Sequence, residues 1–155
     1  MAVFQAGQAL EMAMGMEVNG EAFYKAVSEK TDDEELKALF EDLASQERGH
    51  YKAFERMAQK VDPAPELPDP VAVDYQAYVE VALDQAVFRG EDKAVRLAEQ
   101  AQDRETALRA AMGLEKDTML FYYDLREMVD ESDREIISDI IREERQHLAR
   151  LAQMV

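Results

Sequence analysis

Apolar residues recur at spacings of three and four along most of the chain, and no alternating apolar and polar run competes with this pattern. Such a periodicity is typical of amphipathic helices that bury one face. Glycine, proline and aspartate divide it into segments, because these residues favour turns and helix caps. The sequence therefore predicts an all-α protein with helices over about residues 4–30, 33–61, 75–88, 93–128 and 132–154.

A proline-rich segment separates the second predicted helix from the third. Four prolines lie within residues 62–70, and proline is not tolerated inside a helix, so an extended connection is expected there. The long helices on either side form two antiparallel hairpins, since short turns at 31–33 and 130–133 join them. Two hairpins joined by a long crossover that carries an extra short helix make a ferritin-like four-helix bundle. We expect one domain over residues 1–155.

The two predicted hairpins also resemble each other in sequence, which indicates a duplicated unit. In the first helix of each hairpin, matching residues are 98 positions apart in the sequence. They are Ala9, Leu10, Gly15, Glu17 and Tyr24 in the first hairpin and Ala107, Leu108, Gly113, Glu115 and Tyr122 in the second. In the second helix the offset is 97 residues, and it relates Glu47 and His50 to Glu144 and His147. Gly15 and Gly113 each cost a helix about 1 kcal/mol relative to alanine. We expect close helix packing to explain both, and access to the site is the alternative explanation.

Composition narrows the classes of function. The chain has 18 Lys and Arg against 34 Asp and Glu, a formal charge of -16, which repels nucleic acid and anionic membranes. It has no cysteine, which excludes disulfides, iron–sulfur clusters, thiolate zinc sites and thiol catalysis. No apolar run reaches the length of a membrane span and no basic signal segment opens the chain, so we expect a cytoplasmic protein. Any bound metal must have nitrogen and oxygen ligands.

Both histidines follow a glutamate by three positions, in Glu47-x-x-His50 and Glu144-x-x-His147. This spacing puts imidazole and carboxylate on the same helix face. A single pair of this kind is better explained as a surface pair, but these two lie in the middle of the apolar stripes of their helices. The stripes of the other two long helices carry Glu17 and Glu115. The pattern predicts that six side chains converge inside the bundle.

Four ionised carboxylates in an apolar interior would cost many kcal/mol unless protons or cations neutralise them. The apolar stripes contain no Lys or Arg, whereas two divalent cations would cancel the charge of the four glutamates. Carboxylate and imidazole ligands with open positions suit iron or manganese, with zinc as an alternative, and the histidines argue against magnesium or calcium. The sequence therefore predicts a dinuclear metal site.

One glutamate from each of two helices and Glu-x-x-His from each of the other two is the pattern of ferritin-like di-iron carboxylate proteins. The chain most resembles their rubrerythrin branch, in a form without a rubredoxin domain. The resemblance covers nearly the whole chain and includes the spacing of seven from Glu17 to Tyr24 and from Glu115 to Tyr122. By this resemblance Glu47 and Glu144 bridge two iron ions, Glu17 and His50 complete the ligands of one, and Glu115 and His147 those of the other.

Two departures from the rubrerythrin pattern limit what the resemblance implies. Thr118 stands where rubrerythrins carry a further glutamate, one turn after the third-helix ligand. The redox-linked movement of one iron that accompanies this glutamate therefore does not carry over. The cysteine-ligated domain that relays electrons is missing as well, so electrons must come from an external donor.

The resemblance implies a di-iron oxidoreductase that reacts with O₂ or H₂O₂, as a ferroxidase or as a peroxide reductase. Two alternatives stay open, namely iron binding and storage without turnover, and a helical interaction module with a structural metal. Tyr24 and Tyr122 are interpreted as core aromatics that support the site from outside the ligand shell. A homodimer is expected from apolar residues on the crossover helix, which are Tyr78, Val79, Val81 and Val87.

Overall fold

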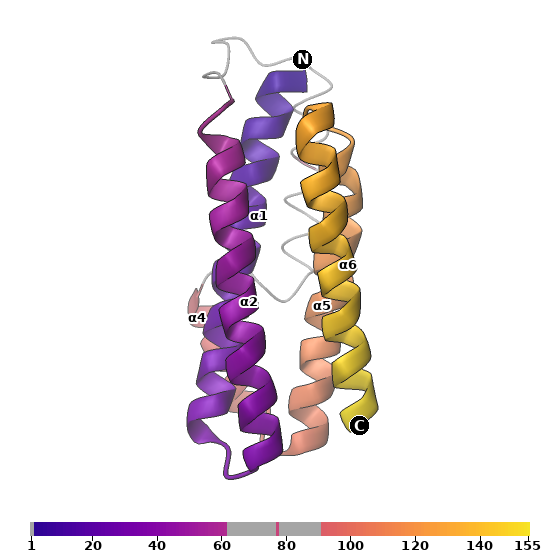
Figure 1. Ribbon diagram of the computed structural model, residues 1–155. Helices are drawn as coiled ribbons and strands as arrows, with labels where there is room; N and C mark the ends of the chain where they lie inside the picture. The colour runs from indigo at the N-terminus through magenta and orange to yellow at the C-terminus, as the bar shows by residue number, and fades with distance from the viewer. Residues whose placement is uncertain (1, 62–76, 78–90) are drawn as a thin grey trace.

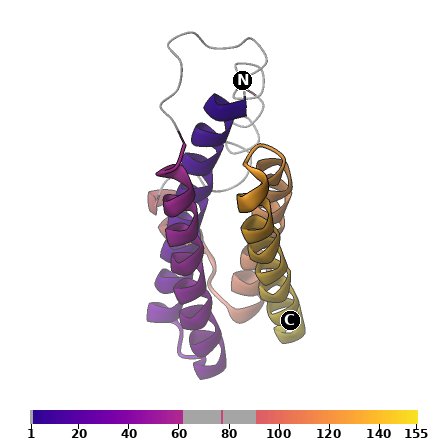
Figure 2. The same ribbon diagram turned by 45° about the horizontal axis from the view of Figure 1, so that its top comes forward.

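The structure is a computed structural model that describes residues 2–61, 77 and 91–155. Its helices are α1 (Ala2–Lys30), α2 (Glu34–Ala58), α4 (Glu91–Gln100), α5 (Arg104–Arg126) and α6 (Glu131–Met154). One hairpin consists of α1 and α2, the other of α5 and α6, and the two hairpins lie side by side (Figures 1 and 2). Because α2 and α5 run in the same direction (Figure 1), a long crossover must join them. The predicted bundle of two hairpins is confirmed.

The helices predicted over 4–30, 33–61 and 132–154 agree with α1, α2 and α6 to within three residues at each end. The proline-rich segment at 62–70 lies outside the described residues. The helix predicted over 75–88 also lies outside the described residues, apart from residue 77. The same is true of the four apolar residues from which a homodimer was expected.

The single helix predicted over 93–128 is wrong, because the structure has two helices there. Helix α4 ends at Gln100 and α5 begins at Arg104. Between them Asp103 has extended backbone angles, φ -134° and ψ 170°, and its side chain accepts a hydrogen bond from the backbone N–H of Thr106. This is the geometry of a helix N-cap. The apolar periodicity continues across the break, which is why the sequence pattern does not reveal it.

Helix α4 packs against α1 (Figure 1) through alanine side chains. Ala94 and Ala98 are fully buried there, and Lys30 of α1 donates a hydrogen bond to the carbonyl oxygen of Ala98 near the end of α4. Because alanine is short, the two helices can approach closely. The contact brings the start of α5 beside the end of α1, so that α5 runs antiparallel to α1.

The buried core forms two clusters, one toward each end of the bundle. The cluster near the α1–α2 turn includes Phe23, Tyr24, Phe40, Leu108 and Leu151. The cluster toward the other end includes Leu10, Phe54, Tyr122, Leu125 and Ile137. Each of the four long helices contributes to both clusters, so the polar side chains between them are held from both sides.

Asp33 closes the N-terminus of α2. Its Oδ1 accepts hydrogen bonds of 3.1 Å from the backbone N–H groups of Glu35 and Leu36, and its Oδ2 accepts one of 2.7 Å from Arg104. We expect Asp33→Ala to lower the free energy of unfolding by about 1 to 2 kcal/mol, mainly through loss of the cap. Asp130→Ala is the matched control, since Asp130 stands at the N-cap of α6 without a side-chain cap hydrogen bond. Urea unfolding of the metal-free proteins measures both losses, and equal losses would contradict the interpretation.

Candidate metal centre

The six side chains singled out in the sequence meet between the two core clusters. They are Glu17 from α1, Glu47 and His50 from α2, Glu115 from α5, and Glu144 and His147 from α6. All six are buried, with at most 4% of any of them exposed. Their convergence follows from the helical pattern, because each lies near the middle of the buried face of its helix.

These side chains form two overlapping groups of four. One group is Glu17, Glu47, His50 and Glu144, and the other is Glu47, Glu115, Glu144 and His147. In each group every residue offers a nitrogen or oxygen atom, and these atoms lie within 4.8 Å of one another. Glu47 and Glu144 belong to both groups. Two buried groups of this kind are consistent with a dinuclear metal site.

Six side-chain atoms of the centre have no hydrogen-bond partner in the described part of the chain. They are Oε2 of Glu17, Oε1 of Glu47, both carboxylate oxygens of Glu144, and Nδ1 of each histidine. Nδ1 of His50 lies 3.0 Å from Oε1 of Glu144, and Nδ1 of His147 lies 2.9 Å from its Oε2, yet these contacts are not aligned as hydrogen bonds. Buried polar atoms without partners are costly. Carboxylate oxygens and imidazole nitrogens gathered in two such groups fit divalent cations of the iron, manganese or zinc type.

Burial governs the protonation of three of the four glutamates. It raises the pKa of Glu47 to about 7 and that of Glu115 to about 8, and in both cases repulsion from Glu144 adds to the effect. Burial likewise raises the pKa of Glu17 well above its usual value, with repulsion from Glu47 second. Protons therefore neutralise part of this charge when no cation is bound.

The fourth glutamate and the two histidines are instead held in their charged forms. Burial would raise the pKa of Glu144, but the close ion-pair contacts with His147 and His50 lower it well below its usual range. Burial also opposes protonation of His147, but Glu115, Glu144 and Glu47 raise its pKa to about 12. The pKa of His50 is raised as well, by Glu144 and Glu17. Without metal, Glu144 is thus the anion that two imidazolium rings share.

Glu17 and Glu115, which each belong to only one of the two groups, are each held by a tyrosine of the opposite hairpin. The hydroxyl of Tyr24 donates a hydrogen bond to Oε1 of Glu115, and that of Tyr122 donates one to Oε1 of Glu17. Burial raises the pKa of both hydroxyls well above the usual range, so they remain donors at neutral pH. The interpretation of both residues as core aromatics that support the site agrees with this geometry.

The outer nitrogen of each histidine also finds its partner in the opposite hairpin. Nε2 of His50 lies 2.7 Å from Oε2 of Glu143, and Nε2 of His147 lies 2.8 Å from Oε1 of Gln46. Both partners are acceptors, which places a proton on Nε2 and leaves Nδ1 for a metal. The sequence interpretation missed Gln46 and Glu143. The available signal was that each immediately precedes the glutamate of a Glu-x-x-His motif, at equivalent positions of the repeat.

Glycines affect the centre differently from what the sequence suggested. A Cβ on Gly15 or Gly113 would meet no atom within 4 Å, so the expectation that close packing explains them is wrong for the described helices. At Gly20, which the sequence pattern places on the apolar stripe of the first helix, a Cβ would lie 2.7 Å from Oε2 of Glu47. Gly20 therefore leaves room for a carboxylate that belongs to both groups.

Gly20→Ala is expected to displace the carboxylate of Glu47 while the fold is kept, because the clash involves the flexible end of a side chain. We expect metal affinity to fall roughly tenfold or more. The control is Gly15→Ala, which should leave metal binding unchanged and stabilise α1 by about 1 kcal/mol. Calorimetric titration with Zn²⁺ measures the affinity. Equal affinity in the two variants would show that the space at Gly20 does not matter.

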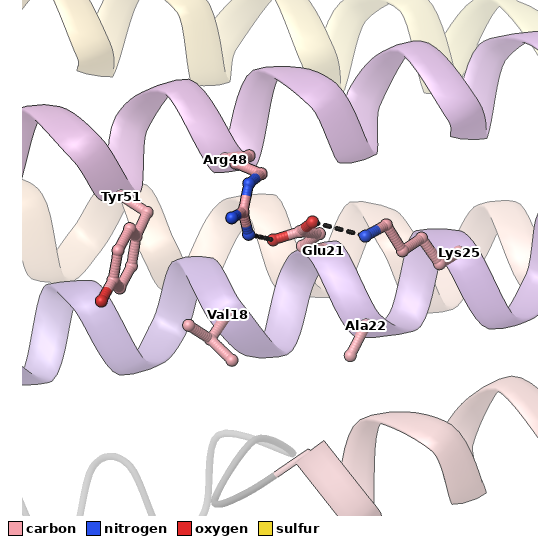
Figure 3. A pocket seen from close by; sticks show the side chains of 6 residues that line it. All are labelled: Val18, Glu21, Ala22, Lys25, Arg48 and Tyr51. Atoms are coloured by element: carbon pink, nitrogen blue, oxygen red, sulfur yellow. Dashed lines mark hydrogen bonds and ion pairs between the residues drawn. The ribbon is translucent and has the colours of Figure 1, made fainter.

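A cavity of about 420 Å³ opens between α1 and α2, away from the centre (Figure 3). Its lining consists of Val18, Glu21, Ala22, Lys25, Arg48 and Tyr51. Glu21 lies between Lys25 and Arg48 and forms ion pairs of 2.6 Å and 3.4 Å with them. None of the six buried side chains of the centre lines this cavity, so it is a separate feature of the surface.

Fold and site together define a ferritin-like helical bundle with a buried carboxylate and histidine centre. The fold matches a crystal structure described as that of a candidate ferritin-like diiron-carboxylate protein from Thermotoga maritima. The two chains are 26% identical with a TM-score of 0.70, over 96% of this chain and 93% of that chain. The family model described as Rubrerythrin matches residues 8–155, and the chain therefore belongs to the rubrerythrin family. No curated protein matches. Among the described helices, none combines the length and apolar character that crossing a bilayer requires.

Proposed function

We propose that this protein binds two iron ions and reacts with O₂ or H₂O₂, as a ferroxidase or as a peroxide reductase. The observation that carries the proposal is the pair of four-residue groups that share Glu47 and Glu144. In this proposal the two shared glutamates bridge the ions. Glu17 and His50 complete the ligands of one ion, and Glu115 and His147 complete those of the other.

Several features support iron. The donor set combines carboxylates with imidazoles, as non-haem iron sites do, and manganese and zinc are the alternatives that it admits. Two divalent ions balance four carboxylates, whereas one would leave a net negative charge in the core. The protein of similar fold from Thermotoga maritima is described as a diiron-carboxylate protein, and membership of the rubrerythrin family points the same way.

Two iron(II) ions bound here would supply one electron each, enough to convert H₂O₂ and two protons into two waters, or O₂ and two protons into H₂O₂. The surrounding side chains determine the conditions of this chemistry. The tyrosine hydroxyls hold Glu17 and Glu115 in place, and the apolar clusters on both sides limit the access of water. Since the chain has no cysteine, an external molecule is the proposed electron donor.

Anaerobic titration with Fe(II), followed by stopped-flow mixing with O₂ or H₂O₂, tests the proposal. We expect two Fe(II) per chain and a rapid rise in near-ultraviolet absorption with at least one oxidant. A Glu115→Gln variant is the control and should lose most of the rise. An iron-loaded protein that changes no faster than free Fe(II) with either oxidant would contradict the proposed reactivity.

Iron binding without turnover is the second candidate. Thr118 is buried on α5 one turn after Glu115 and offers no further carboxylate there. Repeated cycles of reductant and oxidant distinguish the two functions, because a storage protein retains its oxidised iron whereas an enzyme consumes one oxidant per cycle. Metal analysis after purification without chelators tests for a structural zinc ion, and size-exclusion chromatography tests the proposed homodimer.

A further inference from the structure

The two proposed metal positions have the same inner ligands. Each group contains three glutamates and one histidine, and the repeat relates one group to the other. The hydrogen bonds from tyrosine hydroxyls to Glu17 and Glu115 are equivalent too. The two positions therefore do not differ in the types of their proposed ligands.

The two positions differ in the residue that accepts a hydrogen bond from Nε2 of the histidine. The partner of His50 is the carboxylate of Glu143, and the partner of His147 is the side-chain amide of Gln46. Gln46 and Glu143 occupy the same position of the repeat, 97 residues apart, on facing helices α2 and α6. The two hydrogen bonds have nearly equal lengths of 2.7 Å and 2.8 Å. What distinguishes the two outer partners is therefore charge rather than the length of the hydrogen bond.

The amide of Gln46 is held in the orientation that this comparison requires. Its Nε2 donates a hydrogen bond of 2.8 Å to Oδ2 of Asp42, and that oxygen also accepts one of 2.7 Å from Arg150. With the amide nitrogen engaged there, Oε1 of Gln46 faces His147 as a neutral acceptor. Glu143 presents a carboxylate to His50 at the equivalent place, with its side chain 51% exposed.

A carboxylate acceptor strengthens a histidine as a metal ligand more than an amide does. The charge-assisted hydrogen bond makes the imidazole a better electron donor, and the negative charge itself attracts the cation. Because Glu143 is half exposed, solvent screens part of this charge. The expected difference in affinity is therefore about tenfold, at the lower end of what such outer partners contribute.

We propose that Gln46 and Glu143 are positioning residues that make the two metal positions unequal, so that the position at His50 fills before the one at His147. The inference rests on the proposed dinuclear centre and deepens it by assigning an order of filling. In an oxidoreductase such an order sets apart one ion that is held firmly and one that is exchanged more readily.

The test follows which histidine binds first. The chain contains only two histidines, so protein labelled with ¹⁵N-histidine has one pair of imidazole signals for each, and a His147→Gln variant assigns them. Zn²⁺ is the probe, since it is diamagnetic and has no redox chemistry. Repulsion between two bound ions would produce two binding steps even at equal positions. The identity of the first histidine, and not the number of steps, is therefore the readout.

With less than one equivalent of Zn²⁺, we expect about ten times as many molecules to show shifted His50 signals as show shifted His147 signals. Glu143→Gln should bring this ratio close to one. The exchange of both residues, Gln46→Glu together with Glu143→Gln, should invert it. Thermal unfolding of the metal-free variants checks that the fold is retained, which matters because Gln46→Glu places a second carboxylate near Asp42.

Equal shifts of both histidines in the wild-type protein, or an order that survives the exchange of both residues, would overturn the inference while leaving the dinuclear centre standing. A protein that binds no Zn²⁺ at its histidines would overturn the dinuclear centre itself. The two failures are thus distinguishable in one titration.

Discussion

Replacing Glu144 by glutamine is expected to abolish tight binding of the metal pair, whereas replacing Glu17 or Glu115 removes mainly one ion. Glu144 belongs to both four-residue groups, but Glu17 and Glu115 belong to one each. An amide lacks the negative charge and the second acceptor oxygen that a bridging ligand needs. Anaerobic Fe(II) titration should give close to two ions per chain for the wild type, about one for Glu17→Gln or Glu115→Gln, and none for Glu144→Gln. Retention of two ions by Glu144→Gln would contradict the bridging role.

The metal-free form of the same variant tests the electrostatics separately. Glu144 is the shared counter-ion of His50 and His147, at 3.0 Å and 2.9 Å. Its removal leaves buried imidazolium groups without their main partner, a change that typically costs about 3 to 5 kcal/mol. Glu47→Gln is the matched control. Glu47 is also shared by both groups, but burial raises its pKa to about 7. Its neutral form is therefore well tolerated, and this variant should lose metal binding without losing stability.

The stability of the metal-free protein is expected to fall by several kcal/mol as the pH rises from about 5 to about 9. The pKa values of Glu47 and Glu115 are raised from 4.5 to about 7 and about 8. The stability that their protonated forms contribute is complete below pH 4.5 and is lost progressively up to those values. His147 acts in the same sense, because its pKa is raised from 6.5 to about 12. The lowered pKa of Glu144 affects only more acidic solutions.

Metal binding should show the opposite pH dependence over the same interval. A divalent cation needs ionised carboxylates and neutral imidazoles, so its binding releases the protons that hold the empty centre together. Urea unfolding at a series of pH values, with chelator or with excess Zn²⁺, should give two curves that diverge as the pH rises. Calorimetry in buffers of different ionisation enthalpy should detect the released protons. Parallel curves, or binding without proton release, would show that protons do not take the place of the cations.

The convergence of the six side chains could be predicted because the signal was local and duplicated. Glu47 and His50 share a helix face through their spacing alone, and the apolar stripe around them indicates which way that face points. The same reasoning holds for Glu144 and His147. A single copy on a polar face would have carried much less information.

Features that depend on contacts between helices could not be predicted from periodicity. The pairing of His50 with Glu143 joins two helices whose relative rotation no sequence spacing fixes. The function of Gly20 depends on where the carboxylate of Glu47 lies. A Cβ on Gly15, which looks equally unusual in the sequence, would meet no atom of the described residues within 4 Å. The break before α5 could not be predicted because the buried residues Ala98 and Ala101 continue the apolar stripe up to Asp103.

Four hydrogen bonds to the side chains of the centre pass between the two hairpins. Tyrosine hydroxyls join α1 and α5 in both directions, and the histidine partners join α2 and α6 in both directions. One hairpin alone therefore lacks the outer supports of its own ligands. A single hairpin could support its ligands in this way only by pairing with a second, identical copy. Gln46 and Glu143, at equivalent positions of the repeat, are a difference that two identical copies could not have.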